Sequence, residues 1–79
     1  MRIQITNIKR DVNEEDLRKI FEKFGEIKSC ELILDPKNGQ SKGFAFIVMK
    51  NQETNDQAIE AVNGRLINGQ KVKVKLKNY

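Results

Sequence analysis

The sequence contains no histidine and no tryptophan, and it has only one cysteine and one proline. Without histidine, the chain cannot form a Ser-His-Asp or Cys-His nucleophile pair or a histidine-ligated metal site. The single Cys30 excludes an internal disulfide and a thiolate cluster for zinc, and a free thiol fits a reducing, intracellular setting. We therefore expect a binding protein and not an enzyme, with no catalytic residue, no metal and no cofactor.

Long apolar runs are also absent. No segment approaches the roughly 18 apolar residues that a membrane-spanning helix needs, and residues 1–11 contain no apolar stretch long enough for a signal peptide. At 79 residues, the chain has the size of one small domain, so we expect a single domain over residues 1–79, present as a monomer without a membrane partner. Lys and Arg number 15 against 11 for Asp and Glu, and the net charge of +4 is compatible with a few phosphate contacts.

Apolar residues occur in periodic blocks that predict strands and helices. Alternation of polar and apolar residues indicates half-buried strands, and apolar residues spaced by three and four indicate amphipathic helices. Asn13 can cap the first helix, and Gly25 can end it. The predicted elements in chain order are a strand at 2–8, a helix at 13–24, strands at 27–34 and 43–50, a helix at 52–62, a short extended segment at 66–67, and a strand at 70–77.

This order contains two strand-helix-strand units. Right-handed crossovers place both helices on the same side of the sheet. The sequence therefore predicts an α+β fold, the ferredoxin-like βαββαβ sandwich, in which a four-stranded antiparallel sheet carries two helices on one face. The other face of the sheet is left open to solvent.

Alternation along each strand assigns its side chains to the helix face or to the open face. The apolar set is expected to face the helices, and it consists of Ile3, Ile5, Cys30, Leu32, Leu34, Ala45, Ile47, Met49, Val72 and Val74. The opposite set is expected on the open face, and it consists of Arg2, Gln4, Thr6, Ser29, Glu31, Ile33, Phe44, Phe46, Val48, Lys73 and Lys75. Most of this second set is polar, but it includes two phenylalanines that are neighbours on one strand.

Exposed aromatic rings beside lysines suggest a ligand. Bases of a single-stranded nucleic acid stack on aromatic rings, and lysines bind its phosphates. The alternative is that strand 43–50 is covered on both sides, so that Phe44 and Phe46 belong to the core. Neighbouring Gln4 and Lys75 would then need burial as well, which argues against this alternative. Arg2, Lys9 and Arg10 are expected to cluster near the end of the first strand, as phosphate contacts or as ordinary surface charge.

Residues 42–49, KGFAFIVM, resemble the octamer signature of the RNA recognition motif, and residues 3–8, IQITNI, resemble the hexamer of that family. The resemblance covers the whole chain. It implies that Phe46 stacks a base, that Phe44 lies against ribose or between two nucleotides, and that Lys42 pairs with phosphate. It also implies contributions from the last strand and the residues after it. The residues expected to bind RNA are Gln4, Thr6, Lys42, Phe44, Phe46, Lys73, Lys75, Lys77 and Tyr79.

One position departs from the family pattern. The second residue of the hexamer is usually aromatic, and here it is Gln4, so one stacking ring is missing. An amide can hydrogen-bond a base edge but stacks less well, so we expect weaker binding or a shifted register. The interpretation is a domain that binds single-stranded RNA on its sheet. The alternatives are a protein-interaction module with the same fold, and single-stranded DNA binding.

Overall fold

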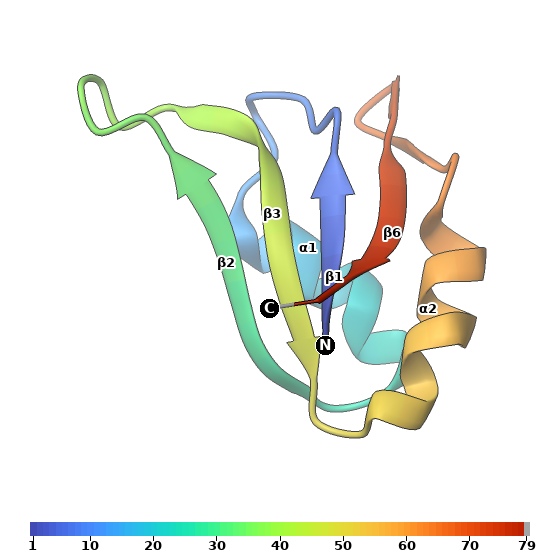
Figure 1. The fold of residues 1–79 in the computed structure, drawn as a ribbon. Helices are drawn as coiled ribbons and strands as arrows, with labels where there is room; N and C mark the ends of the chain where they lie inside the picture. Colours follow the sequence, from blue (N-terminus) through green and yellow to red (C-terminus); the bar gives the residue numbers. More distant parts are fainter. Residues whose placement is uncertain (79) are drawn as a thin grey trace.

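Four antiparallel strands form the main sheet, in the order β2–β3–β1–β6 (Figure 1). The computed structural model describes residues 1–78, so Tyr79, which is predicted above to contact RNA, lies outside the described residues. The strands are β1 at Arg2–Thr6, β2 at Ile27–Leu34, β3 at Ser41–Met49 and β6 at Lys73–Lys77. The predicted four-stranded antiparallel sheet is thereby confirmed.

Both helices cover the same face of this sheet and leave the other face uncovered (Figure 1). The helical segments are α1 at Glu14–Phe21, the 3₁₀ turn η1 at Glu22–Phe24, the 3₁₀ turn η2 at Gln52–Thr54 and α2 at Asn55–Val62. The element order and the one-sided helix layer confirm the ferredoxin-like βαββαβ fold.

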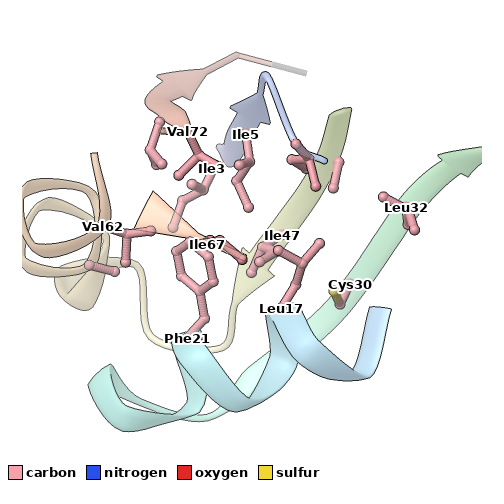
Figure 2. Close-up of a cluster of buried hydrophobic side chains, with 14 of the residues drawn as sticks. Ile3, Ile5, Leu17, Phe21, Cys30, Leu32, Ile47, Val62, Ile67 and Val72 are labelled. Carbon is pink, nitrogen blue, oxygen red and sulfur yellow. The ribbon is translucent and has the colours of Figure 1, made fainter. Parts of the chain in front are cut away.

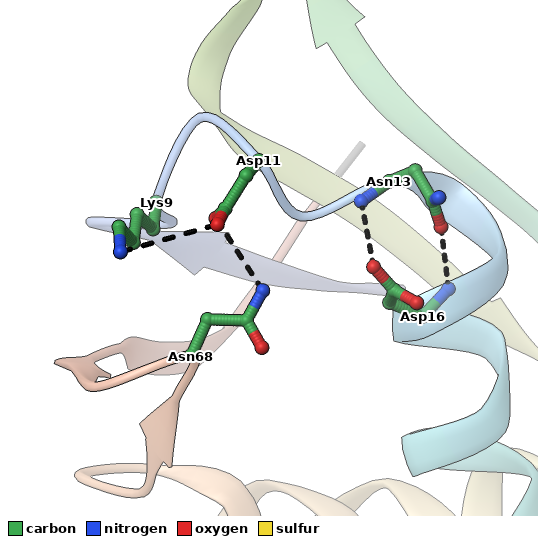
Figure 3. A network of polar contacts seen from close by, with 5 residues as sticks. All are labelled: Lys9, Asp11, Asn13, Asp16 and Asn68. Carbon is green, nitrogen blue, oxygen red and sulfur yellow. Dashed lines mark hydrogen bonds and ion pairs between the residues drawn. The ribbon is translucent and has the colours of Figure 1, made fainter.

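Asn13 caps α1 as predicted. Its side chain accepts a hydrogen bond of 2.8 Å from the backbone N–H of Asp16, and its own N–H donates to the Asp16 carboxylate at 3.1 Å (Figure 3). This reciprocal capping box satisfies two N–H groups that would otherwise lack partners at the start of the helix.

The predicted last strand, 70–77, is in fact two strands in different sheets. Gln70–Lys71 forms β5, which pairs with β4 at Leu66–Ile67, whereas β6 pairs with β1. Val72 separates them because its N–H donates to Arg65 and its carbonyl accepts from Gly64, so its backbone bonds are directed away from β1. The alternation of apolar residues continues through this break, which is why the sequence pattern predicts one strand.

The first strand is also shorter than the predicted 2–8. Asn7 has a φ of 61°, in the left-handed region, and this ends β1 at Thr6. The Asn7 side chain donates a hydrogen bond of 2.7 Å to the Lys71 carbonyl, and the Ile8 N–H donates to the Gly43 carbonyl at 2.9 Å. Asparagine tolerates this backbone conformation better than most residues. The chain therefore turns here from the sheet toward α1.

The core lies between the sheet and the helices (Figure 2). Leu17 and Phe21 of α1 are fully buried, and they point toward the sheet side chains that include Ile47. The predicted helix-facing set is buried with one exception: Leu34 is 50% exposed. The pairing between β2 and β3 shifts register between Leu32 and Leu34, and the hairpin that joins these strands extends beyond the helices (Figure 1). Simple alternation does not hold across such an irregularity.

Candidate nucleic-acid interface

The middle of the open face is a row of four side chains that crosses all four strands. Phe46 of β3 lies opposite Glu31 of β2 on one side and Gln4 of β1 on the other, and Gln4 lies opposite Lys75 of β6. The row thus places an aromatic ring in the centre of the sheet, a carboxylate at one edge and an ammonium group at the other. The structure brings Gln4, Phe46 and Lys75 together as the sequence predicts.

The two phenylalanines of β3 contact each other. The centroids of the Phe44 and Phe46 rings are 6.1 Å apart, and the ring planes are at 83°, an edge-to-face arrangement. Aromatic pairs favour this geometry because the positive edge of one ring meets the negative face of the other. Both rings are partly exposed, so they are neither core side chains nor fully free in solvent. They form a partly exposed aromatic surface on a mostly polar face.

Three lysines of β6 lie on the same open face, with β1 between them and the phenylalanine pair. Lys73, Lys75 and Lys77 are exposed, and their β1 partners are Thr6, Gln4 and Arg2 in that order. A period of two residues places all three side chains on the same face of the sheet. The outer edge of the open face is therefore positively charged along its length.

Arg2 lies directly over Phe46. Its Cζ atom is 3.8 Å from the centroid of the Phe46 ring, a cation–π contact. The alternation pattern assigns Arg2 to the open face correctly. The predicted cluster of Arg2 with Lys9 and Arg10 is wrong, because Arg2 begins β1 whereas Lys9 and Arg10 follow its other end.

A hollow of about 650 Å³ opens beside Phe44 at the end of β1. Three cationic residues line it, Lys9, Arg10 and Lys42, and Thr6 and Gln70 contribute polar groups. The Lys9 ammonium is 3.9 Å from the Asp11 carboxylate, which also accepts a hydrogen bond from Asn68 (Figure 3). Lys42, predicted to pair with phosphate, thus lies at a cationic rim that also adjoins an aromatic ring.

Gln4 has an unusual environment. Its Oε1 atom is buried and accepts no hydrogen bond from the described residues. A buried acceptor without a partner costs about 1–3 kcal/mol, and rotation of the amide toward a hydrogen-bond donor at the surface would remove this cost.

Sequence reasoning missed two contacts, one beside the open face and one in the helical layer. It did not include Gln70 among the binding residues, although the side chain lines the hollow and donates to the Asn7 carbonyl at 2.9 Å. It interpreted Glu14 only as part of a helix start, whereas the Glu14 carboxylate also accepts a hydrogen bond of 3.2 Å from the Leu32 N–H. Both contacts join segments distant in the chain, so no local pattern could have indicated them.

Cys30 is a core residue. Burial raises the pKa of its thiol from 9.0 to about 11, which keeps it protonated near neutral pH. Only the thiolate is an effective nucleophile or metal ligand.

Within residues 1–78, no three acidic, cysteine or histidine side chains are grouped so that they could hold a metal ion. In the same part of the chain, no helix has the length and apolar character required to cross a membrane.

The architecture and this face define a class of protein: a small βαββαβ domain with paired aromatic rings on a sheet face without helices. The chain matches the family model of the RNA recognition motif over residues 3–73, and it belongs to this family.

The chain is similar in sequence to known proteins and in fold to solved structures. The chain is 34% identical over 73 residues to the poly(U)-binding-splicing factor PUF60 of Bos taurus and of Homo sapiens, a match that covers 92% of the chain. It spans only 14% of the length of the Bos taurus protein and 13% of the human one. The crystal structure of the RNA-binding protein PG1 superposes with a TM-score of 0.90 at 33% identity, covering 95% of this chain and 90% of that chain. The RNA15 RNA recognition motif superposes with a TM-score of 0.91 at 25% identity, covering 96% and 87%.

Proposed function

We propose that this chain binds single-stranded RNA on the open face of its sheet, as one module formed by residues 1–79. The observation that carries the proposal is the Phe44–Phe46 pair, which lies on the face without helices together with three exposed lysines of β6. Aromatic rings with nearby cations are suited to a single strand, whose bases stack while its phosphates remain accessible. The binding needs no catalytic group.

The proposed contacts follow from the positions of the side chains. The phenylalanine pair would contact bases and ribose, and Gln4 would hydrogen-bond a base edge through its amide. Lys42 would bind a phosphate at the rim of the cationic hollow. Thr6, Lys73, Lys75 and Lys77 would guide the backbone along the β1–β6 side of the sheet, where they lie in register. We extend the same role to Tyr79 from the family resemblance alone.

The similar proteins support RNA as the ligand and suggest a probe. Family membership and the 33% identity to an RNA-binding protein favour RNA over a peptide. The name of the splicing factor, poly(U)-binding, makes oligouridine a useful test ligand. Single-stranded DNA differs mainly in lacking the 2′-hydroxyl, so a DNA strand of the same sequence is the natural comparison.

The test is a fluorescence-anisotropy titration of labelled single-stranded RNA of about eight nucleotides, either random in sequence or oligouridine. Wild-type protein is compared with Phe46→Ala at two salt concentrations. We expect the substitution to weaken binding about tenfold, because base stacking on a ring contributes about 1–3 kcal/mol per base. We also expect salt to weaken binding, with a log–log slope that increases by about 0.7 for each phosphate contact.

The matched control is Phe24→Ala. Phe24 packs against the core from the helical layer and is absent from the open face, so its loss should not change RNA affinity in protein that remains folded. Equal affinity of wild type and Phe46→Ala would exclude the sheet face as the RNA surface. Absence of binding by folded wild-type protein at low salt would contradict the proposal and favour a protein partner. Equal affinity for the matched DNA strand would remove the preference for RNA.

A further inference from the structure

The contact between Arg2 and Phe46 changes how a base can approach the centre of the sheet. A Cζ atom 3.8 Å from the ring centroid is at van der Waals contact. Arginine stacks its planar guanidinium on aromatic faces, and a Cζ atom at this distance above the ring fits that parallel arrangement. One face of the Phe46 ring is therefore already covered by a flat, positively charged group.

The side chain of Arg2 follows the sheet surface to reach this position. The main-chain partner of Arg2 is Lys77, one row away from the row of Gln4 and Phe46. The side chain must therefore cross diagonally to Phe46, a separation that long side chains can span. Its Nε atom is buried, although the residue itself is only partly buried. Arg2 thus lies along the sheet and does not extend into solvent.

A guanidinium group in this position has a second face. Nucleobases stack on arginine guanidinium planes as well as on aromatic rings. Gln4, two residues along the same face of β1, replaces the ring that the family usually places there. Arg2 supplies a planar surface one step away from that position, supported from below by Phe46.

We propose that Arg2 is a stacking residue for a base of the bound RNA, so that a base, the Arg2 guanidinium and the Phe46 ring form a column of three layers. This inference rests on the proposed function, because it assigns a role within the RNA-binding face. It adds an RNA-binding residue outside the octamer and the hexamer. In this column Phe46 acts through Arg2, because the ring supports the guanidinium on which the base stacks, and direct contact of Phe46 with RNA is limited to the part of the ring that Arg2 leaves exposed.

The test compares Arg2→Lys with Arg2→Ala in the same anisotropy titration, beside wild type and Phe46→Ala. Lysine retains the positive charge but has no planar group on which a base can stack. We expect Arg2→Lys to weaken RNA binding about fivefold or more, on the scale of one lost base stack. Its salt slope should equal that of wild type, because the charge is preserved. Arg2→Ala should be weaker still and should have a smaller slope.

Arg18→Lys is the matched control. Arg18 belongs to α1, which covers the opposite face of the sheet, so the same chemical change there should leave affinity unchanged. Circular dichroism of each variant checks that it is folded.

Other outcomes overturn the inference and remain distinguishable from failure of the proposed function. If Arg2→Lys binds like wild type while Phe46→Ala is weakened, the RNA face stands and Arg2 acts only through its charge. If both Arg2 variants bind more tightly than wild type, Arg2 is a cover that the base must displace, and the stacking role is wrong. If folded wild-type protein binds no RNA, the proposed function fails, and this inference fails with it.

Discussion

At the scale of single residues, the open face of the sheet is distinguished by its planar side chains. Phe44 and Phe46 are flat and partly exposed, Arg2 provides a third plane, and Gln4 provides an amide with a buried oxygen that accepts no hydrogen bond from the described residues. Stacking depends on planar area, whereas hydrogen bonding depends on donor and acceptor positions. At the position where the family usually has an aromatic ring, Gln4 has hydrogen-bonding groups instead of planar aromatic area.

Replacement of Gln4 by phenylalanine tests whether an aromatic ring at this position binds RNA more tightly than an amide does. We expect Gln4→Phe to raise affinity for single-stranded RNA about fivefold, since a new ring beside Phe46 adds a stacking surface. The affinity is measured by anisotropy with the labelled RNA used above. Gln4→Leu is the matched control, because it removes the amide without adding a ring. An equal gain in both variants would show that removal of the amide, and not stacking, is responsible.

At the scale of elements, short helices are positioned by their ends. The α1 helix spans only Glu14–Phe21, and isolated helices of this length are marginal in water. Its start is held by the Asn13–Asp16 capping box, and its first turn is joined to β2 through the carboxylate of Glu14 and the N–H of Leu32. The cap thus helps to hold Leu17 and Phe21 against the sheet.

Asn13→Ala is expected to lower the free energy of unfolding by about 1 kcal/mol, because it removes the side-chain acceptor of the capping box. Urea denaturation followed by circular dichroism measures this quantity. Glu15→Ala is the control: Glu15 lies in the same turn, and its exposed ion pair with Lys19, at 4.0 Å, contributes little. A loss as large for Glu15→Ala as for Asn13→Ala would contradict the cap as the cause. RNA affinity of the folded variants should not change.

At the scale of the whole molecule, the two faces of the sheet differ in what covers them. One face is buried by α1 and α2 and forms the hydrophobic core. The other face carries the partly exposed rings and the lysines of β6. A chain of 79 residues has a small core, and its total stability is expected to be only about 5–10 kcal/mol. The free energy lost when one large core side chain is removed is therefore a large fraction of that total.

Two phenylalanine substitutions separate these roles. Phe21 is fully buried, so Phe21→Ala should lower the free energy of unfolding by about 3–5 kcal/mol. Phe46 is partly exposed, so Phe46→Ala should lower it by only about 1 kcal/mol while weakening RNA binding. Urea denaturation and anisotropy on the same samples measure both effects. If Phe46→Ala lowered the free energy of unfolding by several kcal/mol, the Phe46 ring would contribute to the core as much as Phe21 does.

Much of this arrangement was determined by local sequence patterns. Alternation of polar and apolar residues assigned Ile3 and Ile5 to the core and Gln4 to the open face, because successive side chains of a strand point to opposite faces. The capping residue Asn13 was equally predictable, because a cap is a local contact over three residues. The placement of Phe44 and Phe46 on a sheet face without helices followed from the same alternation combined with the order of elements.

Other features were decided only by tertiary structure. Leu34 is exposed because the β2–β3 register shifts, and Val72 leaves the main sheet because its hydrogen bonds go to Gly64 and Arg65. Neither effect has a local pattern, since both depend on which distant backbone groups meet. The contact between Arg2 and Phe46 likewise has no local pattern. The two residues are 44 positions apart in the chain and meet only because β1 pairs with β3. Sequence alternation determined which residues share the open face, and strand register decided which of them touch.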